Sequence, residues 1–281
     1  MLRVFLGLAV VPLVFLTSVT GSDASRTPGR LALTPNAIAF RDSSHGLAGT
    51  GWISCGYPQA TCRPAGTISR TFDGGRTWRV VLRTPRPVAW VGVVEGISWA
   101  RFDDGENLRS TDGGRTWRPA IQLAPPYSPC PQALAQLSDV FVTAGGREWA
   151  LCAGQGGAGS MGKAVYRLTP RGWRRVAWTQ FGPPGRGYGG ISIYGYPLGI
   201  AMADDGFGLI WESRGTLYVT RDGARLWQGL PKIARPEVDF GVFGAALPDG
   251  VGFVLLMRGD ARRLLETHDY GRTWHVVHRW R

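Results

Sequence analysis

The feature that most constrains this chain of 281 residues is an eight-residue pattern that returns four times. Each copy begins with Ser or Thr, has Asp at its third position and ends with Trp. The four octets occupy residues 71–78, 110–117, 220–227 and 267–274. Self-similarity at intervals of tens of residues indicates a repeat architecture, so the whole chain is expected to be built from one repeated unit.

The octet predicts a tight turn between two antiparallel strands. Asp and Gly at its centre permit the backbone angles of a sharp reversal. We expect the Asp carboxylate to accept hydrogen bonds from backbone N–H groups two or three residues further on, with the leading hydroxyl joining the network. The closing Trp should open the next strand and fill the space between neighbouring sheets. We assign a structural role to Asp73, Trp78, Asp112, Trp117, Asp222, Trp227, Asp269 and Trp274.

Strand-like segments between the octets predict five units. The stretch between the second and third complete octets holds one more unit, whose turn at 169–172 lacks the Asp. The tryptophans that open the last strand of each unit are therefore 39, 56, 54 and 47 residues apart. Four short strands in a unit of this length make a propeller blade. The chain is predicted to be all-β, a five-bladed β-propeller of four-stranded antiparallel blades over residues 36–281.

The strands can be placed individually. They are predicted at 36–41, 47–54, 66–71 and 78–82 in the first unit, 96–102 and 107–111 in the second, 139–143, 148–152, 164–168 and 173–178 in the third, 199–203, 208–212 and 216–220 in the fourth, and 243–247, 252–257 and 262–267 in the fifth.

The octets resemble the Asp-box, or bacterial neuraminidase repeat (BNR), of a β-propeller superfamily. The form with His45-Gly46 and a Gly-Arg-Thr-Trp ending is similar to the photosystem II stability/assembly-factor-like group, and sialidases carry the box too. The motif is specific for fold rather than function. In those families the box lies on the face away from the active site, which implies a structural role for the four aspartates here.

The N-terminus has the pattern of an export signal. Arg3 precedes an apolar run at 4–16, and Ser22-Asp23-Ala24 is a small-x-small motif for cleavage before Ser25. The alternative is an uncleaved membrane anchor, although the run is shorter than the ~17 residues that a spanning helix needs. We expect a signal peptide at 1–24, an N-terminal extension at 25–35 and an extracellular or cell-envelope location.

The charge and composition of the chain indicate which classes of binding partner to expect. The net charge is +12, and all but two of the 32 basic residues are Arg, a bias typical of a GC-rich bacterial genome. Such a charge favours encounters with anionic surfaces. Runs of basic residues never exceed two, so specific nucleic-acid binding is not indicated. The expected partner is a protein or an anionic glycan or wall polymer, with weak association with anionic membranes; the oligomeric state stays open.

Four cysteines in an exported chain suggest two disulfides, with three possible pairings. If the octets mark one end of the propeller, the loops between second and third strands and the connections between blades share the other. Cys55 and Cys62 fall in one such loop, Cys130 in the connection into the third unit, and Cys152 at the end of that unit's second strand. We predict the pairs Cys55–Cys62 and Cys130–Cys152.

The longest insertions, 119–135, 153–163 and 179–197, share the end away from the octets. Propellers often bind ligands where several connections converge. The third insertion carries Arg186, Tyr188, Tyr194 and Tyr196, which could hold an anionic or sugar-like ligand by hydrogen bonds and stacking. The alternative is that these loops only cover the mouth of the central channel.

An enzymatic function finds little support. The resemblance to sialidases implies an arginine triad, a Tyr–Glu pair and an acidic proton donor. Phe40-Arg41 matches only half of the first triad motif, and five blades depart from the six of sialidases. The four His have no metal-ligand spacing, and no nucleotide motif is present, so neither a metal nor a cofactor is expected. The sequence favours a non-enzymatic binding or assembly scaffold, with a sialidase-like glycoside hydrolase as the alternative.

Overall fold

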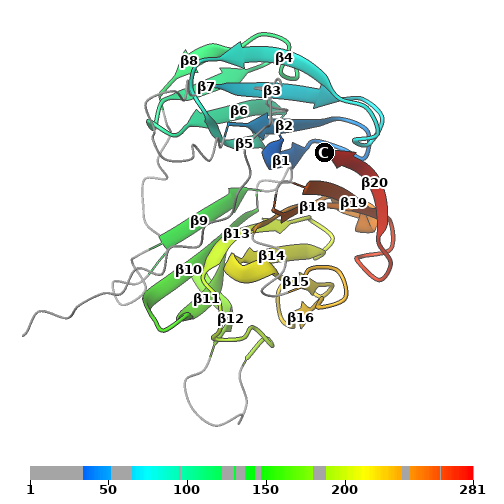
Figure 1. Cartoon of the computed structure of the whole chain (residues 1–281). Coiled ribbons are helices and arrows are strands. Elements are labelled where there is room, and N and C mark those ends of the chain that lie inside the picture. Colours follow the sequence, from blue (N-terminus) through cyan, green and yellow to red (C-terminus); the bar gives the residue numbers. More distant parts are fainter. Residues whose placement is uncertain are drawn as a thin grey trace, which may run out of the picture. The chain divides into compact units, whose positions relative to one another are not determined.

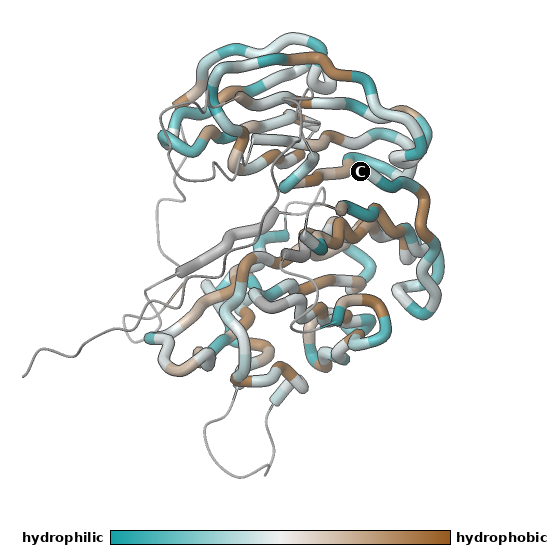
Figure 2. Tube along the Cα trace, in the orientation of Figure 1, coloured by the Kyte–Doolittle hydropathy of each residue, from teal (hydrophilic) through white to brown (hydrophobic). Residues whose placement is uncertain are grey.

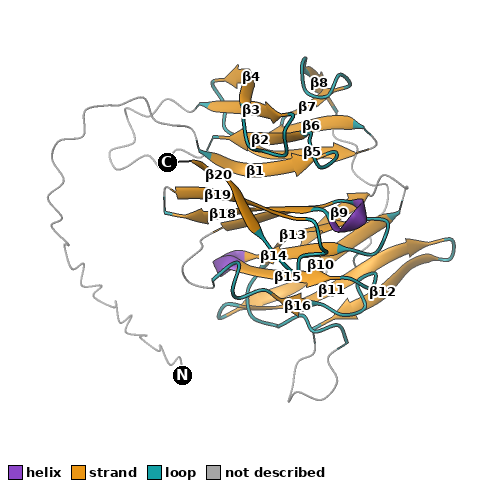
Figure 3. Ribbon diagram, turned by 90° about the vertical axis from the view of Figure 1, so that its right-hand side faces the viewer, coloured by secondary structure: helices purple, strands orange, loops and turns teal. Residues whose placement is uncertain are grey.

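The computed structural model describes residues 34–51, 65–94, 96–121, 130, 137–142, 147–179, 188–235, 241–259 and 261–280. They belong to one compact unit, Leu33–Arg281. Its strands form five four-stranded antiparallel sheets, each made of consecutive strands (Figure 1). The chain is therefore a five-bladed β-propeller, and Figure 3 shows how little of it is helical. None of the helices described is long and apolar enough to cross a membrane.

The strands of the blades have the following bounds. Blade 1 holds β1 (Pro35–Phe40), β2 (Gly46–Thr50), β3 (Gly66–Thr71) and β4 (Arg79–Thr84), and blade 2 holds β5 (Val88–Val94), β6 (Ile97–Phe102), β7 (Asn107–Ser110) and β8 (Arg118–Ala120). Blade 3 holds β9 (Leu137–Val142), β10 (Glu148–Gly157), β11 (Ser160–Thr169) and β12 (Gly172–Trp178). Blade 4 holds β13 (Pro197–Met202), β14 (Gly208–Glu212), β15 (Thr216–Thr220) and β16 (Gln228–Gly229). Blade 5 holds β17 (Gly241–Ala246), β18 (Gly252–Arg258), β19 (Ala261–Thr267) and β20 (His275–Trp280).

The octet turns are closed by the Asp side chain. Asp112 Oδ1 accepts hydrogen bonds from Ser110 Oγ (2.7 Å), from the backbone N–H of Arg115 (2.8 Å) and from that of Thr116 (2.9 Å). The backbone donors lie three and four residues on, one further than predicted, because the two residues after the Asp both adopt left-handed angles (φ 68° and 82°). The same pattern recurs at Asp222 and Asp269.

The octet tryptophan belongs to the turn rather than to the next strand. β4 begins at Arg79, one residue after Trp78, and the other octets behave in the same way. The indole N–H of Trp78 donates to the carbonyl of Gly75 at 2.8 Å, which ties the ring back to the turn. The predicted strand start at Trp78 is therefore one residue early, whereas β3, β14 and β15 have the predicted bounds.

Blade 3 corrects one predicted loop. Residues 153–163 were expected to form an insertion, but β10 and β11 continue through it as a long hairpin with Gly157 opposite Ser160. The absence of a side chain at Gly156 leaves room for the ring of Tyr196, which would lie 2.6 Å from a Cβ there. A Gly- and Ala-rich stretch resembles a flexible loop in sequence, yet here its small residues allow a neighbouring segment to pack closely.

The core consists of apolar layers between neighbouring blades. Each octet Trp packs in the layer between its own blade and the preceding one: Trp78 between blades 5 and 1, Trp117 between 1 and 2, Trp227 between 3 and 4, and Trp274 between 4 and 5. Figure 2 shows apolar segments along the strands and hydrophilic residues at many of the turns. The prediction that these rings fill the space between sheets is confirmed.

Blades 5 and 1 meet through side chains, because every blade is made of consecutive strands. The rings of Phe40 and Phe253 stack with centroids 3.6 Å apart, and both are buried. Arg76 Nη2 donates to Glu266 Oε2 at 3.2 Å, and the backbone carbonyl oxygen of Arg76 lies 2.9 Å from His278 Nδ1. The contact between first and last blades therefore combines an apolar stack with polar links from an octet residue.

Candidate functional site

The octet turns lie at one end of the propeller, and the connection from blade 3 to blade 4 runs from the third octet, where the N–H of Trp227 donates to the carbonyl of Gly189 at 2.7 Å, to the other end. At one end, the turn between β1 and β2 contacts the first octet, where the N–H of Gly74 donates to the carbonyl of Ser44 at 3.0 Å. At the other, the connection from blade 3 to blade 4 contacts the β10–β11 turn, where the N–H of Gly195 donates to the carbonyl of Gly159 at 2.9 Å. We call these the octet end and the connection end.

A buried ion pair lies beneath that connection. Lys163 Nζ, on β11, is 2.8 Å from Glu212 Oε1, at the end of β14, and both side chains are inaccessible to solvent. The ammonium also donates to the carbonyls of Ser192 and Tyr194, each at 2.7 Å. The pair therefore joins blade 3, blade 4 and the chain that connects them.

Gly195 lets the connection pass over the carboxylate. Its φ is +84°, and a Cβ there would come within 2.7 Å of Glu212 Oε2. A side chain would suffer both the strain of left-handed geometry and this collision. The connection and the ion pair thus fit only when residue 195 is glycine.

The pKa shifts of the buried groups reflect their enclosure away from solvent. Burial raises the pKa of Glu212 to about 7, although Lys163 opposes the shift. Burial likewise lowers the pKa of Lys163, with Glu212 acting in the opposite direction. Burial and the nearby Glu212 raise the pKa of Tyr218 to about 12, and its hydroxyl accepts the N–H of Ser192 at 3.2 Å. Because the acid and the ammonium are both enclosed, their arrangement orders the connection and offers no reactive group to a substrate.

The predicted site tyrosines divide into two kinds. Tyr188 and Tyr194 are 61 % and 72 % exposed. Tyr188 stacks on Trp178 with centroids 4.6 Å apart, and the Arg175 guanidinium lies 4.0 Å from the centroid of the same indole. The hydroxyl of Tyr196 instead accepts the N–H of Gly159 at 3.1 Å, which fixes the blade 3 hairpin. Arg186 lies outside the described residues.

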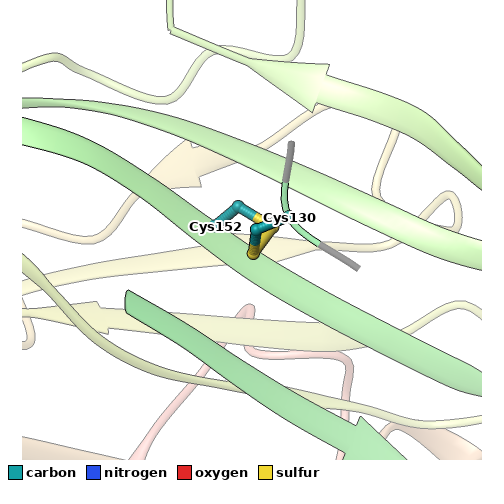
Figure 4. Close-up of a disulfide and its surroundings, with 2 residues drawn as sticks. All are labelled: Cys130 and Cys152. Carbon is teal, nitrogen blue, oxygen red and sulfur yellow. A yellow bond between two sulfur atoms is a disulfide. The ribbon is translucent and has the colours of Figure 1, made fainter. Parts of the chain in front are cut away.

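Cys130 and Cys152 form the predicted disulfide, with their Cα atoms 5.5 Å apart (Figure 4). Both are buried in a cluster with Ala164 and Tyr166, against which Trp178 also packs. The bond attaches the chain entering blade 3 to the sheet that supports Tyr188. The predicted pair Cys55–Cys62 lies outside the described residues.

Sequence reasoning did not single out Lys163 or the role of Glu212. A signal was present, because alternation along β14 places Glu212 on the same face as Ile210, which is fully buried. Lys163 is one of only two lysines and stands in the apolar strand β11. A charged residue at an inward position of each of two neighbouring blades predicts a pair.

Arg41, the residue that half-matches the first sialidase arginine, lies at the octet end. Its Nε donates to Asp42 Oδ2 at 3.1 Å, and its Nη1 would be 3.9 Å from a Cβ at Gly113 in the second octet. It therefore does not join Tyr188 or Tyr194 at the connection end. In the part of the chain that the structure describes, no group of three or more His, Cys, Asp or Glu side chains could hold a metal ion.

Known proteins resemble this chain only distantly. No family model matches the chain, and no curated protein matches its sequence. Solved structures similar to it include YCF48 bound to D1 peptide, at 15 % identity and a TM-score of 0.37 over 83 % of this chain and 93 % of that one. YCF48 from Cyanidioschyzon merolae has 16 % identity and a TM-score of 0.40, covering 84 % and 95 %. Hadza microbial sialidase Hz136 has 14 % identity and a TM-score of 0.41, covering 85 % and 56 %.

Proposed function

We propose that this protein is an exported, non-enzymatic binding or assembly scaffold whose partner, a protein, docks on the connection end. The observation that carries the proposal is the buried Lys163–Glu212 pair, which holds the Ser192 and Tyr194 carbonyls. These two buried charges order a connection whose exposed side chains include Tyr188 and Tyr194. An ordered aromatic surface binds at a low cost in conformational entropy.

Export is supported by two independent features. The N-terminal segment 1–24 has the charge and hydropathy pattern of a signal peptide. The Cys130–Cys152 disulfide belongs to the chemistry of oxidising compartments. The octet geometry, with its Asp-centred turn and tethered Trp, further supports membership of the Asp-box propeller superfamily that the sequence resembles.

The glycosidase alternative requires acidic groups in reach of a sugar. Glu212, the acid buried at the connection end, is enclosed and faces Lys163. Arg41 lies at the octet end with Asp42 as its partner. We therefore expect no turnover of fluorogenic sialosides or aryl glycosides by the purified protein; turnover that Arg41→Ala abolishes would restore the enzymatic alternative.

The scaffold proposal is tested by affinity capture from the envelope fraction of the native host. The variant Tyr188→Ser with Tyr194→Ser should lose a co-purifying protein that the wild type retains. Phe72→Ser is the matched control, because Phe72 is also an exposed aromatic residue (50 %) but lies in the first octet, away from this connection. Equal retention by both variants would contradict docking at the connection end.

A further inference from the structure

A cavity at the octet end lies between blades 1 and 2. The volume open to the centre of a water-sized sphere is about 30 Å³, and the empty space around it, which includes open solvent, is about 300 Å³. Its walls include Leu47 from β2, Val93 from β5 and Ser98 from β6, and two arginines, Arg41 and Arg70, also line it. The cavity therefore has both apolar and arginine side chains in its lining. It lies at the end of the propeller opposite the proposed docking surface.

Arg70 is the unusual member of this cavity. It is only 8 % exposed, and its guanidinium lies 4.5 Å from the centroid of the Phe72 ring. Within the residues that the structure describes, no oxygen accepts a hydrogen bond from this guanidinium. None of the guanidinium nitrogens is among the atoms sealed from solvent without a partner, so its five donors are open to water or to an anion.

Two guanidiniums converge over one glycine of the second octet. A Cβ placed on Gly113 would lie 3.6 Å from Arg70 Nη2 and 3.9 Å from Arg41 Nη1. The space that a side chain would fill at this position is therefore flanked by donors from two arginines. Such paired, planar donors match the geometry of a carboxylate or a phosphate.

The surrounding charges leave this position positive. Burial lowers the pKa of Arg70, and repulsion from Arg115 and Arg41 lowers it further, while Asp112 acts in the opposite direction. Asp112 accepts hydrogen bonds from Ser110, Arg115 and Thr116 but none from Arg70. Arg41 has its own carboxylate in Asp42, so neither carboxylate forms an ion pair with Arg70.

We propose that this cavity is a binding site for a small oxyanion group, a carboxylate or a phosphate, held by Arg70 and Arg41 over Gly113. Leu47 and Val93 form the apolar wall that limits the competition of water. The site does not depend on the scaffold proposal, since it lies at the other end of the propeller and its test requires no protein partner.

The test is thermal unfolding of the purified protein in phosphate, in acetate and in chloride at equal ionic strength and pH 7. At least one oxyanion should raise the wild-type midpoint above its value in chloride, by an increment that grows with the logarithm of its concentration. Phosphate and acetate are separate arms, so the response of each identifies the group that the site prefers. No increment with either oxyanion would overturn the proposal.

Variants assign the effect to the cavity. Arg70→Met keeps the long apolar stem and should abolish the increment, whereas Arg41→Gln, at an exposed position, should only weaken it. Arg83→Met is the matched control, because Arg83 is an exposed arginine of β4 in the same blade and should leave the increment unchanged. An Arg70→Met protein that responds like the wild type would overturn the proposal. Calorimetric titration with inorganic phosphate or acetate gives the same comparison without unfolding.

Discussion

At the scale of single residues, the charges that matter most are the enclosed ones. Glu212 and Lys163 are both inaccessible and 2.8 Å apart, so their attraction offsets part of the cost of burying each charge. Arg70 is 8 % exposed and packs against the Phe72 ring without an ion-pair partner among the described residues. The Lys163–Glu212 pair stabilises a connection of the fold, whereas Arg70 belongs to the proposed anion site.

The ion pair predicts strong coupling between its members. Lys163→Met and Glu212→Gln should each lower the free energy of unfolding by about 3–5 kcal/mol, because each leaves one buried group without its partner. The double variant should cost clearly less than the sum, as measured by a double-mutant cycle in chemical denaturation. Additive costs would contradict the pairing.

The same pair gives a signed pH dependence. Burial holds the pKa of Glu212 near 7, above its ordinary 4.5, so the folded protein retains this proton more strongly than the unfolded chain. In Lys163→Met nothing opposes that shift. The free energy of unfolding of this variant should therefore fall as pH rises from 4.5 towards 7 and beyond. A profile parallel to that of Lys163→Met with Glu212→Gln would contradict this account.

The contacts of a residue could be predicted from the sequence only where its partners lie close to it along the chain. The turn hydrogen bonds of the octet aspartates can be anticipated from sequence because their partners lie within four residues. Lys163 and Glu212, and likewise Arg70 and Gly113, meet only when two blades pack, so local patterning does not reveal their contact. Tyr196 illustrates the same limit, since its partner Gly159 becomes apparent only in the folded hairpin.

At the scale of elements, the octet turn is the recurring unit. Strands β3, β14 and β15 were predicted to the residue because an octet or a polar turn bounds them. The hairpin of β10 and β11 was missed because its Gly and Ala residues favour no strand by themselves. Packing against Tyr196, rather than propensity, determines its structure.

The octet turn predicts acid sensitivity. Burial opposes ionisation of Asp73, but hydrogen bonds from Thr77 and Thr71 outweigh it and lower the pKa to about 2. Stability from this carboxylate is present above pH 3.8 and is lost as pH falls through about 2. Asp73→Asn should therefore show a flatter decrease of the unfolding midpoint between pH 4 and 2, whereas Asp103→Asn, outside the octets, should follow the wild type. Parallel profiles for Asp73→Asn and the wild type would refute the role of this carboxylate.

The disulfide gives a second prediction at this scale. It joins cysteines separated by 22 positions, and closing a loop of that size stabilises a fold by about 3 kcal/mol. Replacing Cys130 and Cys152 together by Ala should lower the free energy of unfolding by this amount in chemical denaturation. Reduction of the wild type should have a similar effect. An unchanged denaturation midpoint would show that the bond does not constrain the chain.

At the scale of the whole molecule, the ring depends on side-chain contacts between the first and last blades. Phe253→Ala removes one ring of the buried stack with Phe40 and should cost about 3–5 kcal/mol of unfolding free energy. Leu226→Ala, at an exposed position, should cost little. Comparable small costs for both in chemical denaturation would contradict closure through this stack.

At this scale, we expect the two ends of the propeller to have different functions. The octet end carries the repeated turns and the arginine cavity, and the connection end carries the exposed Tyr194, which pairs with Ser160 of the β10–β11 hairpin. The central prediction is that a protein partner docks on the connection end. The most direct test is a photo-crosslinking amino acid incorporated at position 194 or, separately, at position 72 in the native host. A crosslinked protein partner is predicted from position 194 and none from position 72; no crosslink from position 194, or one from position 72 alone, would contradict docking on the connection end.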